Sequence, residues 1–225
     1  MNQFSQHKTY TATRLTDSVQ VDSDWNKSPW NDIEPLQVTE YMGPEPAHKP
    51  GVEVKVAYDT QAVYVIFRVE DRFVRSTRTA YQDPVYKDSA VEFFFCPADD
   101  SSSGYFNLEI NCGGTALFRF KNKDKEKVLI PEELFKQVEI AHSLPEIVDP
   151  EIQQPVTWTL EFRLPVSILE QYYDVSRPAP GNKWRVNFYK IADESSHPHY
   201  LTWSKVIGPK PNFHLPEYFG TLIFE

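Results

Sequence analysis

Apolar and polar residues alternate with a period of two through most of this chain, and this pattern limits the folds it can adopt. The clearest case is the stretch 52–71, where V-E-V-K-V-A-Y-D and A-V-Y-V-I-F-R-V-E-D flank a turn at Asp59. Successive side chains of a strand point to opposite faces of a sheet. The pattern therefore predicts a hairpin that buries its valines and Phe67 on one face.

About ten to twelve such segments follow one another at intervals of about 8 to 15 residues, separated by proline, glycine and polar turns. Residues 165–172, P-V-S-I-L-E-Q-Y, have the spacing of a helix, and residues 131–135 suit a single helical turn. The chain is therefore predicted to be all-β, an antiparallel β-sandwich with one short helix. We expect one domain over residues 18–225, preceded by a polar, flexible lead-in at residues 1–17.

The composition fits a large core and argues against nucleic acid as a partner. Of 225 residues 40% are apolar, with 15 Phe, 12 Tyr and 5 Trp, which is typical of a globular chain and not of a disordered one. The formal charge is −9, whereas affinity for a phosphate backbone depends on clustered Lys and Arg. The run at 121–127, K-N-K-D-K-E-K, includes Asp124 and Glu126, which indicates a solvated loop.

The two cysteines are predicted to be free thiols. If the segments that end at Cys96 and begin at Tyr105 form a hairpin, Cys112 lies about seven residues beyond the position opposite Cys96, roughly 23 Å away. A disulfide needs Cα atoms within about 7 Å. The first residues contain no apolar leader, and no stretch approaches the ~20 apolar residues of a membrane span. The sequence fits a cytoplasmic protein or the mature form of a secreted one.

The stretch 84–96, P-V-Y-K-D-S-A-V-E-F-F-F-C, is a candidate for both core and binding surface. Its alternation places apolar side chains on one face and Glu92 on the other, beside the loop that carries Tyr86. The next segment, Y-F-N-L-E-I-N, presents Asn107 and Glu109 together on one face. Such a surface suits a saccharide, which offers apolar C–H faces and hydroxyl edges. The alternative is a half-buried strand whose Glu92 is solvated.

Signatures of catalysis and of metal binding are weak. The chain contains no Walker loop, G-x-S-x-G, H-E-x-x-H, C-x-x-C or G-x-G-x-x-G motif. Glu92 with Glu109 has the residue types of a glycosidase pair, but 32 acidic residues produce such pairs by chance. His197 and His199 alternate around a proline, with His214 close in sequence. They form either part of a metal site or a set of hydrogen-bonded loop histidines.

Two tryptophans near the N-terminus, Trp25 and Trp30, lie on either side of a Lys-Ser-Pro turn. Exposed tryptophans in a turn can act as stacking platforms for sugar rings, whereas buried ones close the end of a sandwich. We favour the buried plug because tryptophan is highly buried on average.

Several motifs in a fixed order resemble one known family. They are W-N-x-x-x-W at 25–30, V-K-V-A-Y-D-x-x-x-V-Y-V-x-F-x-V-x-D at 54–71, D-S-A-V-E-F-F-F at 88–95, W-x-x-E-F-R-L-P at 158–165, and an ending that begins W-S at 203 and continues N-F-H-x-P-E-Y-F-G-T-L. Together they span residues 18–225 and resemble the family 9 carbohydrate-binding modules, which are related to the DOMON-like domains. The resemblance implies a β-sandwich that binds saccharide without catalysis, serves a glycoside hydrolase in polysaccharide catabolism and holds structural calcium.

The resemblance also implies site residues. Members of that family clamp a sugar between two tryptophans and hold its hydroxyls with a strand glutamate. Trp203 matches the second tryptophan and Glu92 the glutamate, while Tyr86 stands near the place of the first tryptophan and Asn107 replaces an arginine. With Glu109 and Tyr189 on neighbouring strands, these residues are the predicted ligand site; stacking and a few hydrogen bonds imply roughly millimolar to micromolar affinity.

Two other function classes stay open at this level. Related DOMON-like domains include haem binders that ligate iron through Met and His, and here Met42 and His48 lie six residues apart. A carbohydrate-active hydrolase that uses Glu92 is the other alternative. We expect no organic cofactor for a carbohydrate-binding module.

Overall fold

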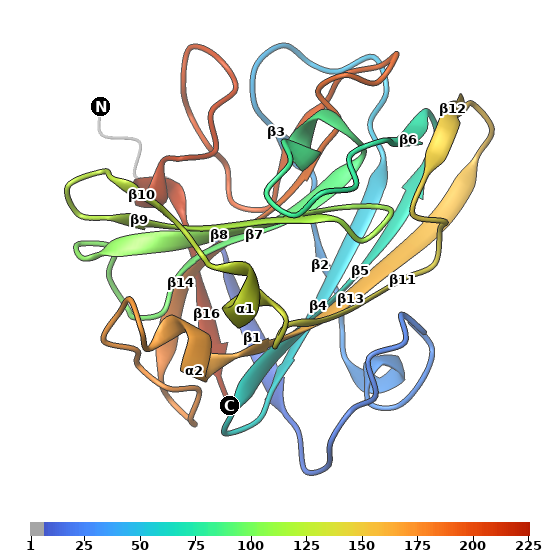
Figure 1. Cartoon of the computed structure of the whole chain (residues 1–225). Helices are drawn as coiled ribbons and strands as arrows, with labels where there is room; N and C mark the ends of the chain where they lie inside the picture. Colours follow the sequence, from blue (N-terminus) through green and yellow to red (C-terminus); the bar gives the residue numbers. More distant parts are fainter. Residues whose placement is uncertain (1–6) are drawn as a thin grey trace.

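The computed structural model describes residues 7–225, which form two curved β-sheets packed face to face (Figure 1). The first sheet contains, in spatial order, β10 (Lys127–Leu129), β9 (Ala116–Asn122), β8 (Gly104–Asn111), β7 (Ala90–Cys96), β14 (Lys183–Ile191) and β16 (Gly220–Phe224). The second contains β4 (Gly51–Tyr58), β5 (Ala62–Asp71), β13 (Val156–Pro165) and β11 (Glu139–His142), with β2 (Leu36–Gln37) beside β4. Neighbours within each of these two groups run antiparallel, so the predicted all-β sandwich is confirmed.

Short elements complete the two sheets. β15 (Tyr200–Thr202) lies between β14 and β3 (Glu40–Tyr41), and β6 (Val74–Ser76) pairs with β12 (Val148–Ile152) apart from the main sheets. The α-helices are α1 (Glu132–Phe135) and α2 (Val166–Leu169). Single 3₁₀ turns occupy Trp30–Asp32, Val85–Lys87 and Pro216–Tyr218. Among the described residues, no helix is long and apolar enough to cross a membrane.

The lead-in predicted at residues 1–17 contains a strand, β1 (Thr9–Arg14). β1 runs parallel to β16 through its first residues and then parallel to β4, so it joins the two sheets along one edge. Ala12 is fully buried there. The polar sequence of β1 does not indicate a buried strand. Its pairing partners in β16 and β4 lie far away in sequence, so the pairing leaves no local signal either. Residues 1–6 of that prediction lie outside the described residues.

The helix predicted at 165–172 is shorter than expected. α2 ends at Leu169, and the backbone N–H groups of Tyr172 and Tyr173 both bond to the Leu169 carbonyl as the chain turns. The turn directs both tyrosine rings toward Phe106 in the core. Residues 131–135, which suited one helical turn, form α1.

Aromatic side chains fill the space between the sheets. In β7 the ring of Phe93 stacks on Phe95 and on Phe188 of β14, with centroid distances of 4.5 and 5.1 Å. Phe95 also stacks on Trp184 at 5.6 Å. This is the face that the alternation of residues 90–96 predicts to be core. The opposite face of β7 is buried as well, so the half-buried strand with a solvated glutamate is excluded.

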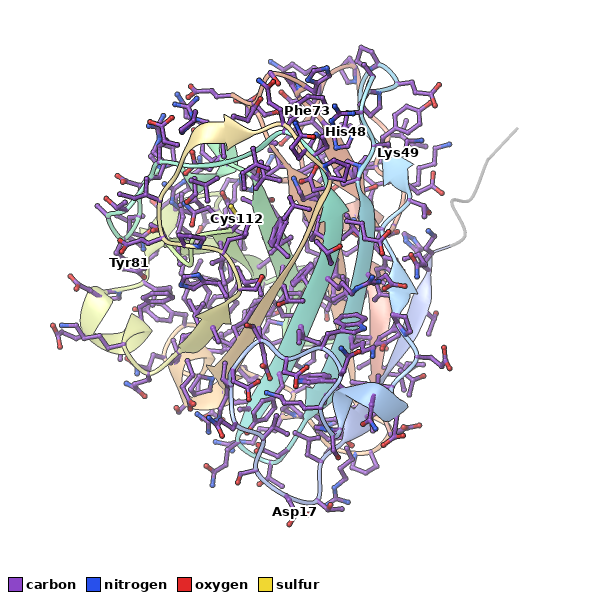
Figure 2. All side chains as sticks on the ribbon, turned by 90° about the vertical axis from the view of Figure 1, so that its right-hand side faces the viewer. Asp17, His48, Lys49, Phe73, Tyr81 and Cys112 are labelled. Carbon is purple, nitrogen blue, oxygen red and sulfur yellow. The ribbon has the colours of Figure 1, made fainter. Side chains whose placement is uncertain are left out.

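Trp30 and the loop around it cover the outer face of the second sheet, at the end of the molecule near Asp17 (Figure 2). Trp30 is fully buried and donates its indole N–H to Glu161 Oε1 at 2.9 Å. Glu161 Oε2 accepts three further hydrogen bonds, from the backbone N–H groups of Asp22 and Ser23 and from the Lys27 ammonium. Trp30 is therefore buried as predicted, but against the outer face of the second sheet and not between the sheets at the end of the sandwich. Trp25 is only partly buried against the same cluster.

Cys96 and Cys112 are unpaired and buried, as the hairpin register predicts. β7 and β8 pair with Phe95 opposite Phe106, so the next position along β7, Cys96, falls opposite Tyr105. Burial raises the pKa of both thiols, that of Cys112 to about 12.

Candidate binding site

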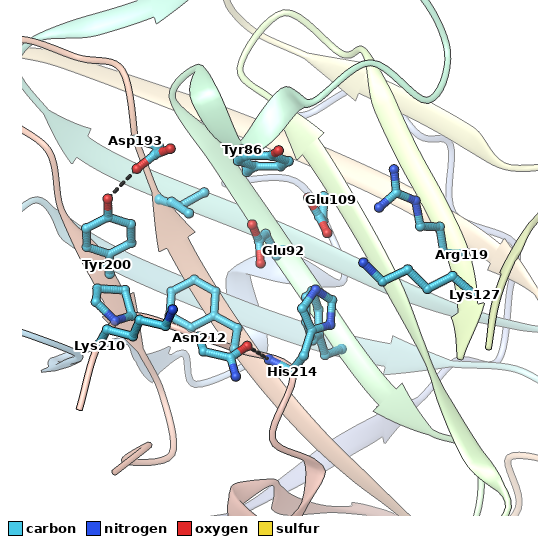
Figure 3. A pocket seen from close by; sticks show the side chains of 14 residues that line it. Tyr86, Glu92, Glu109, Arg119, Lys127, Asp193, Tyr200, Lys210, Asn212 and His214 are labelled. Carbon is cyan, nitrogen blue, oxygen red and sulfur yellow. Dashed lines mark hydrogen bonds between the residues drawn. The ribbon is translucent and has the colours of Figure 1, made fainter. Parts of the chain in front are cut away.

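A cavity of about 410 Å³ lies on the outer face of the first sheet (Figure 3). Its floor is the face of β7 and β8 that points away from the core. Its wall is the C-terminal loop, which we define as residues 205–215. This loop is held against the sheet by Phe213, whose ring stacks on Tyr189 at 4.1 Å. The cavity is lined by Tyr86, Glu92, Phe94, Glu109, Arg119, Lys127, Ile191, Asp193, Tyr200, Lys210, Pro211, Asn212, Phe213 and His214.

Two glutamates stand side by side on the floor. Glu92 of β7 is directly opposite Glu109 of β8, and both side chains are buried. Asn107 donates a hydrogen bond to Glu109 Oε1 at 2.8 Å. The Oε2 atoms of both glutamates are buried without any hydrogen-bond partner among the described residues. Two adjacent carboxylates thus present unused acceptors beside the cavity.

Glu161, which does not line the cavity, is a useful comparison for the two glutamates of the floor. That side chain is also inaccessible, yet its two oxygens together accept four hydrogen bonds. Buried polar groups without partners cost free energy, and native structures contain few of them. The unpartnered oxygens of Glu92 and Glu109 differ from those of Glu161 in this respect, and both residues line the cavity.

The pKa values of both carboxyl groups are raised. Burial raises the pKa of Glu92 well above its usual range, and the adjacent Glu109 raises it further. Burial also raises the pKa of Glu109, although the Asn107 hydrogen bond and the charge of Arg119 act in the opposite direction. Both pKa values move the same way, unlike those of a glycosidase pair, in which one group stays ionised. The pair is better suited to binding than to acid–base catalysis.

Aromatic rings surround the two carboxylates. Tyr86, on the 3₁₀ turn before β7, lies beside Glu92, and Tyr200 of β15 lies across the cavity with its hydroxyl donating to Asp193 (Figure 3). His214 closes the side near Lys127, and its Nδ1 is 2.8 Å from the Tyr105 hydroxyl. Rings and carboxylates together provide apolar faces and hydrogen-bond acceptors within one cavity.

Three of the six predicted site residues line this cavity: Tyr86, Glu92 and Glu109. Asn107 is buried beside them and reaches the site only through Glu109. Tyr189 is fully buried under the Phe213 ring, so it supports the C-terminal loop and does not line the cavity.

Trp203, predicted as an exposed stacking platform, belongs to the core. Its side chain is 3% exposed, and its ring packs edge-on to Phe188 with the centroids 5.7 Å apart. β15 pairs with β14 so that Tyr200 and Thr202 face outward, and alternation turns Leu201 and Trp203 inward. The W-S motif predicted the residue type correctly but not the face on which it lies.

Several residues that line the cavity were not predicted from the sequence. Arg119 and Lys127 lie on the hairpin β9–β10, which was interpreted as solvated loop beyond residue 121, and Tyr200 belongs to a three-residue strand. A register signal existed for Arg119, because it is directly opposite Asn107 on the neighbouring strand. No local signal marks the loop residues Asn212 and His214, which approach the sheet only through tertiary packing.

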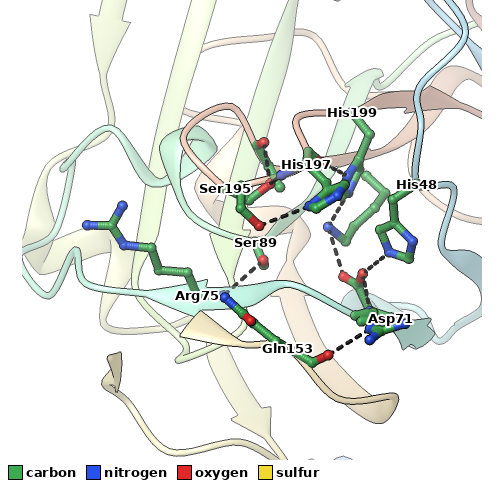
Figure 4. Close-up of polar contacts among 12 residues, drawn as sticks. His48, Asp71, Arg75, Ser89, Gln153, Ser195, His197 and His199 are labelled. Atoms are coloured by element: carbon green, nitrogen blue, oxygen red, sulfur yellow. Dashed lines mark hydrogen bonds and ion pairs between the residues drawn. The ribbon is translucent and has the colours of Figure 1, made fainter. Parts of the chain in front are cut away.

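The histidines near residues 197–199 belong to a separate network at one end of the sandwich (Figure 4). The buried Lys190 ammonium lies 3.3 Å from Asp71 Oδ2 and 2.8 Å from His199 Nε2. Asp71 Oδ1 is 2.7 Å from His48 Nε2. Burial, together with the Lys190 charge, lowers the pKa of His199 to about 3, so this ring is a neutral acceptor. His197 stacks on Phe73 at 3.6 Å.

The structural calcium that the resemblance implies stays a prediction, because Ca²⁺ can also be bound by backbone carbonyl groups and water. No group of three or more His, Cys, Asp or Glu side chains among residues 7–225 is placed to hold a metal ion. Asp71 is already bound to Lys190 and His48, and Asp88 accepts hydrogen bonds from the backbone N–H groups of Thr77 and Arg78. The lysine ammonium is the cation of that network.

The Met and His considered as haem ligands also have structural partners. Met42 is buried in the outer cluster of the first sheet, and its sulfur accepts the Asn212 backbone N–H at 3.1 Å. His48 is held by Asp71.

An all-β sandwich with an open cavity on the outer face of one sheet defines a class of ligand-binding domains. The sequence matches the model of Carbohydrate-binding family 9 over residues 19–224, and the chain belongs to this family. Its domains are non-catalytic carbohydrate-binding modules, which confirms the family resemblance and the expectation of a non-enzyme.

Solved structures agree with this placement. A protein from Bacteroides uniformis, described as a candidate carbohydrate-binding protein, is 27% identical, with a TM-score of 0.88 over 98% of this chain and 100% of the other. A family 9 module from Caldicellulosiruptor kristjanssonii in complex with glucose is 14% identical, with a TM-score of 0.64 over 97% and 96% of the two chains. A family 9 module from the same organism in complex with cellotriose is 15% identical, with a TM-score of 0.67 over 97% of this chain and 94% of the other. The last two establish likeness of fold. No curated protein matches the chain.

Proposed function

We propose that the cavity between the β7–β8 floor and the C-terminal loop is the saccharide site of this module. The observation that carries the proposal is the pair of buried carboxylates, Glu92 and Glu109, whose Oε2 atoms have no partner among the described residues. Hydroxyl groups on adjacent carbons of a sugar ring can donate to two neighbouring carboxyl groups at once. Such bonds would remove the cost of leaving buried acceptors unpaired.

The aromatic residues act on the apolar face of the same sugar. Tyr86 and Tyr200 replace the tryptophan clamp that the family resemblance implies, since Trp203 is in the core. A cavity of about 410 Å³ lies at the small end of the range for ligand pockets and suits one or two sugar units. Smaller rings and few hydrogen bonds predict dissociation constants in the millimolar to micromolar range.

Calorimetric titration with glucose and cello-oligosaccharides tests the proposal, because related structures contain these sugars. A glycan array extends the search to other saccharides. We expect Glu92→Gln to weaken binding by about tenfold or more, and Tyr86→Ala to weaken it while Tyr86→Phe retains it. Glu53→Gln, the same change on the other sheet, is the control. Equal affinity in the wild type, Glu92→Gln and Tyr86→Ala proteins would place the site elsewhere.

Association with a glycoside hydrolase in polysaccharide catabolism stays a prediction from the family. Co-purification of the module with such an enzyme from the source organism tests it, and a module that binds its sugar yet never accompanies a hydrolase would argue against it.

A further inference from the structure

The hairpin β9–β10 places three cations together, and two of them, Arg119 and Lys127, line the cavity. Lys127 is directly opposite Lys121, and Arg119 lies two residues from Lys121 on the same face of β9. Like charges directly opposite each other in an antiparallel pair are destabilising. None of the three forms an ion pair with an acidic side chain within residues 7–225, whereas Lys27, Lys87 and Lys136 all do.

Arg119 also has a hydrogen-bond donor without a partner within the described part of the chain. Its Nε is buried and makes no hydrogen bond to any described residue. Arginine carries five N–H donors in a planar fork that matches a carboxylate or sulfate group, so a buried unpartnered Nε beside a cavity is the counterpart of the unpartnered glutamate oxygens. In Figure 3 the guanidinium of Arg119 and the ammonium of Lys127 both lie on the far side of Glu109 from Tyr200.

The charges of these three cations also lower the pKa of the neighbouring His214. Burial, together with the charges of Lys121, Lys127 and Arg119, lowers the pKa of His214 to about 4. His214 is therefore neutral at pH 7 and adds no positive charge. The positive charge at this side of the cavity therefore comes from the cations of the β9–β10 hairpin, which act to lower the pKa values of His214 and Glu109.

We propose that the saccharide bound in this cavity carries an anionic substituent, a uronate carboxylate or a sulfate ester, which is held by Arg119 and Lys127. The inference rests on the proposed function and divides the cavity between two kinds of contact. Glu92 and Glu109 accept hydroxyl hydrogen bonds from the ring, and the cations receive the acidic group at the side of the β9–β10 hairpin. The module then distinguishes an acidic sugar from its neutral counterpart by charge.

The test compares glucuronate and galacturonate with their methyl esters, with glucose and with glucose 6-sulfate, by calorimetric titration. A methyl ester keeps the ring and its hydroxyl groups, removes the charge and adds one methyl group, whereas glucose lacks the acidic group altogether. We expect an acidic sugar to bind about tenfold or more tightly than its neutral counterpart, with an affinity that falls as salt is added. Tighter binding of the sulfate identifies a sulfated sugar as the ligand, and tighter binding of a uronate identifies the carboxylate.

Arg119→Gln with Lys127→Gln should lower the affinity for the acidic sugar more than the affinity for its neutral counterpart, so that the preference is lost. The matched control is Lys123→Gln with Lys125→Gln, which removes the same charge from the same hairpin at positions that do not line the cavity. The inference is wrong if acid and neutral sugars bind equally, or if both double variants lower the preference alike; the proposed function then still holds. Absence of binding by every saccharide, on the array as well, would overturn both.

Discussion

Two buried glutamates allow a direct test of the argument that locates the site. Glu161 and Glu92 are both inaccessible, but Glu161 accepts four hydrogen bonds and Glu92 Oε2 accepts none from the described residues. The change to Gln keeps the size of each side chain and replaces one oxygen, which accepts hydrogen bonds, by an amide nitrogen, which donates them. Its effect on stability should therefore depend on how many bonds each carboxylate makes.

For Glu161→Gln the expected loss is about 3 kcal/mol. The amide group must face either the indole N–H of Trp30 or the three donors at Oε2, so at least one buried donor is left unpaired, at a cost of about 1–3 kcal/mol. The remaining bonds lose the strength that comes from a charged acceptor. For a domain of this size, about 3 kcal/mol corresponds to a fall of roughly 6 to 12 °C in Tm.

For Glu92→Gln the same reasoning predicts no loss of stability in the absence of ligand, or a gain at pH 7, since no bond is broken and a buried acid is replaced by a neutral amide. Urea denaturation and thermal unfolding of the two variants and the wild type, with sugar titration of each, provide the measurement. Glu161→Gln should retain sugar affinity while folded, and Glu92→Gln should lose it. A Glu92→Gln protein destabilised as much as Glu161→Gln would refute the reasoning, because Glu92 would then have a structural role.

Further predictions concern pH, the core and the thiols. The raised pKa values of Glu92 and Glu109 mean that the folded state holds more protons than the unfolded state above the usual value of 4.5. Their contribution to stability is thus fully present below that pH and falls as pH rises toward neutrality; a Gln–Gln double variant should show a flatter stability–pH curve than the wild type in chemical denaturation. Trp203→Ala should cost about 3–5 kcal/mol, whereas Trp203→Phe should cost less and leave sugar affinity unchanged; weaker binding by a fully folded Trp203→Phe protein would restore a ligand role. Cys96 and Cys112 should react with a thiol reagent only after unfolding, and fast labelling of the native protein would contradict their burial.

The strands that carry the site could be predicted from sequence because alternation is a local signal. The hairpin β7–β8 and the shared face of Glu92 and Glu109 follow from period two and one turn. Parallel pairing of β1 with β16 could not be predicted in this way, since it joins the two ends of the chain and leaves no local trace.

Trp203 shows the limit of motif matching. A motif conveys the type of residue, but whether that residue reaches the ligand depends on register, and here the pairing of β15 with β14 turns Trp203 inward. The cluster of Arg119, Lys121 and Lys127 could not be predicted for a related reason. The charges of residues 121–127 alternate in sign along the chain, but folding of the hairpin brings Lys127 opposite Lys121 and separates both from the acidic residues between them.

The alternation of β7 also separates two kinds of evolutionary change. Odd-numbered positions such as Phe93 and Phe95 form the inter-sheet core, and even-numbered positions such as Glu92 face the cavity. Mutations at the outward positions that line the cavity, such as Glu92, Glu109 and Arg119, can therefore change the proposed sugar site without altering the packing between the sheets. A combinatorial library limited to these outward positions would sample new ligand specificities on an unchanged scaffold.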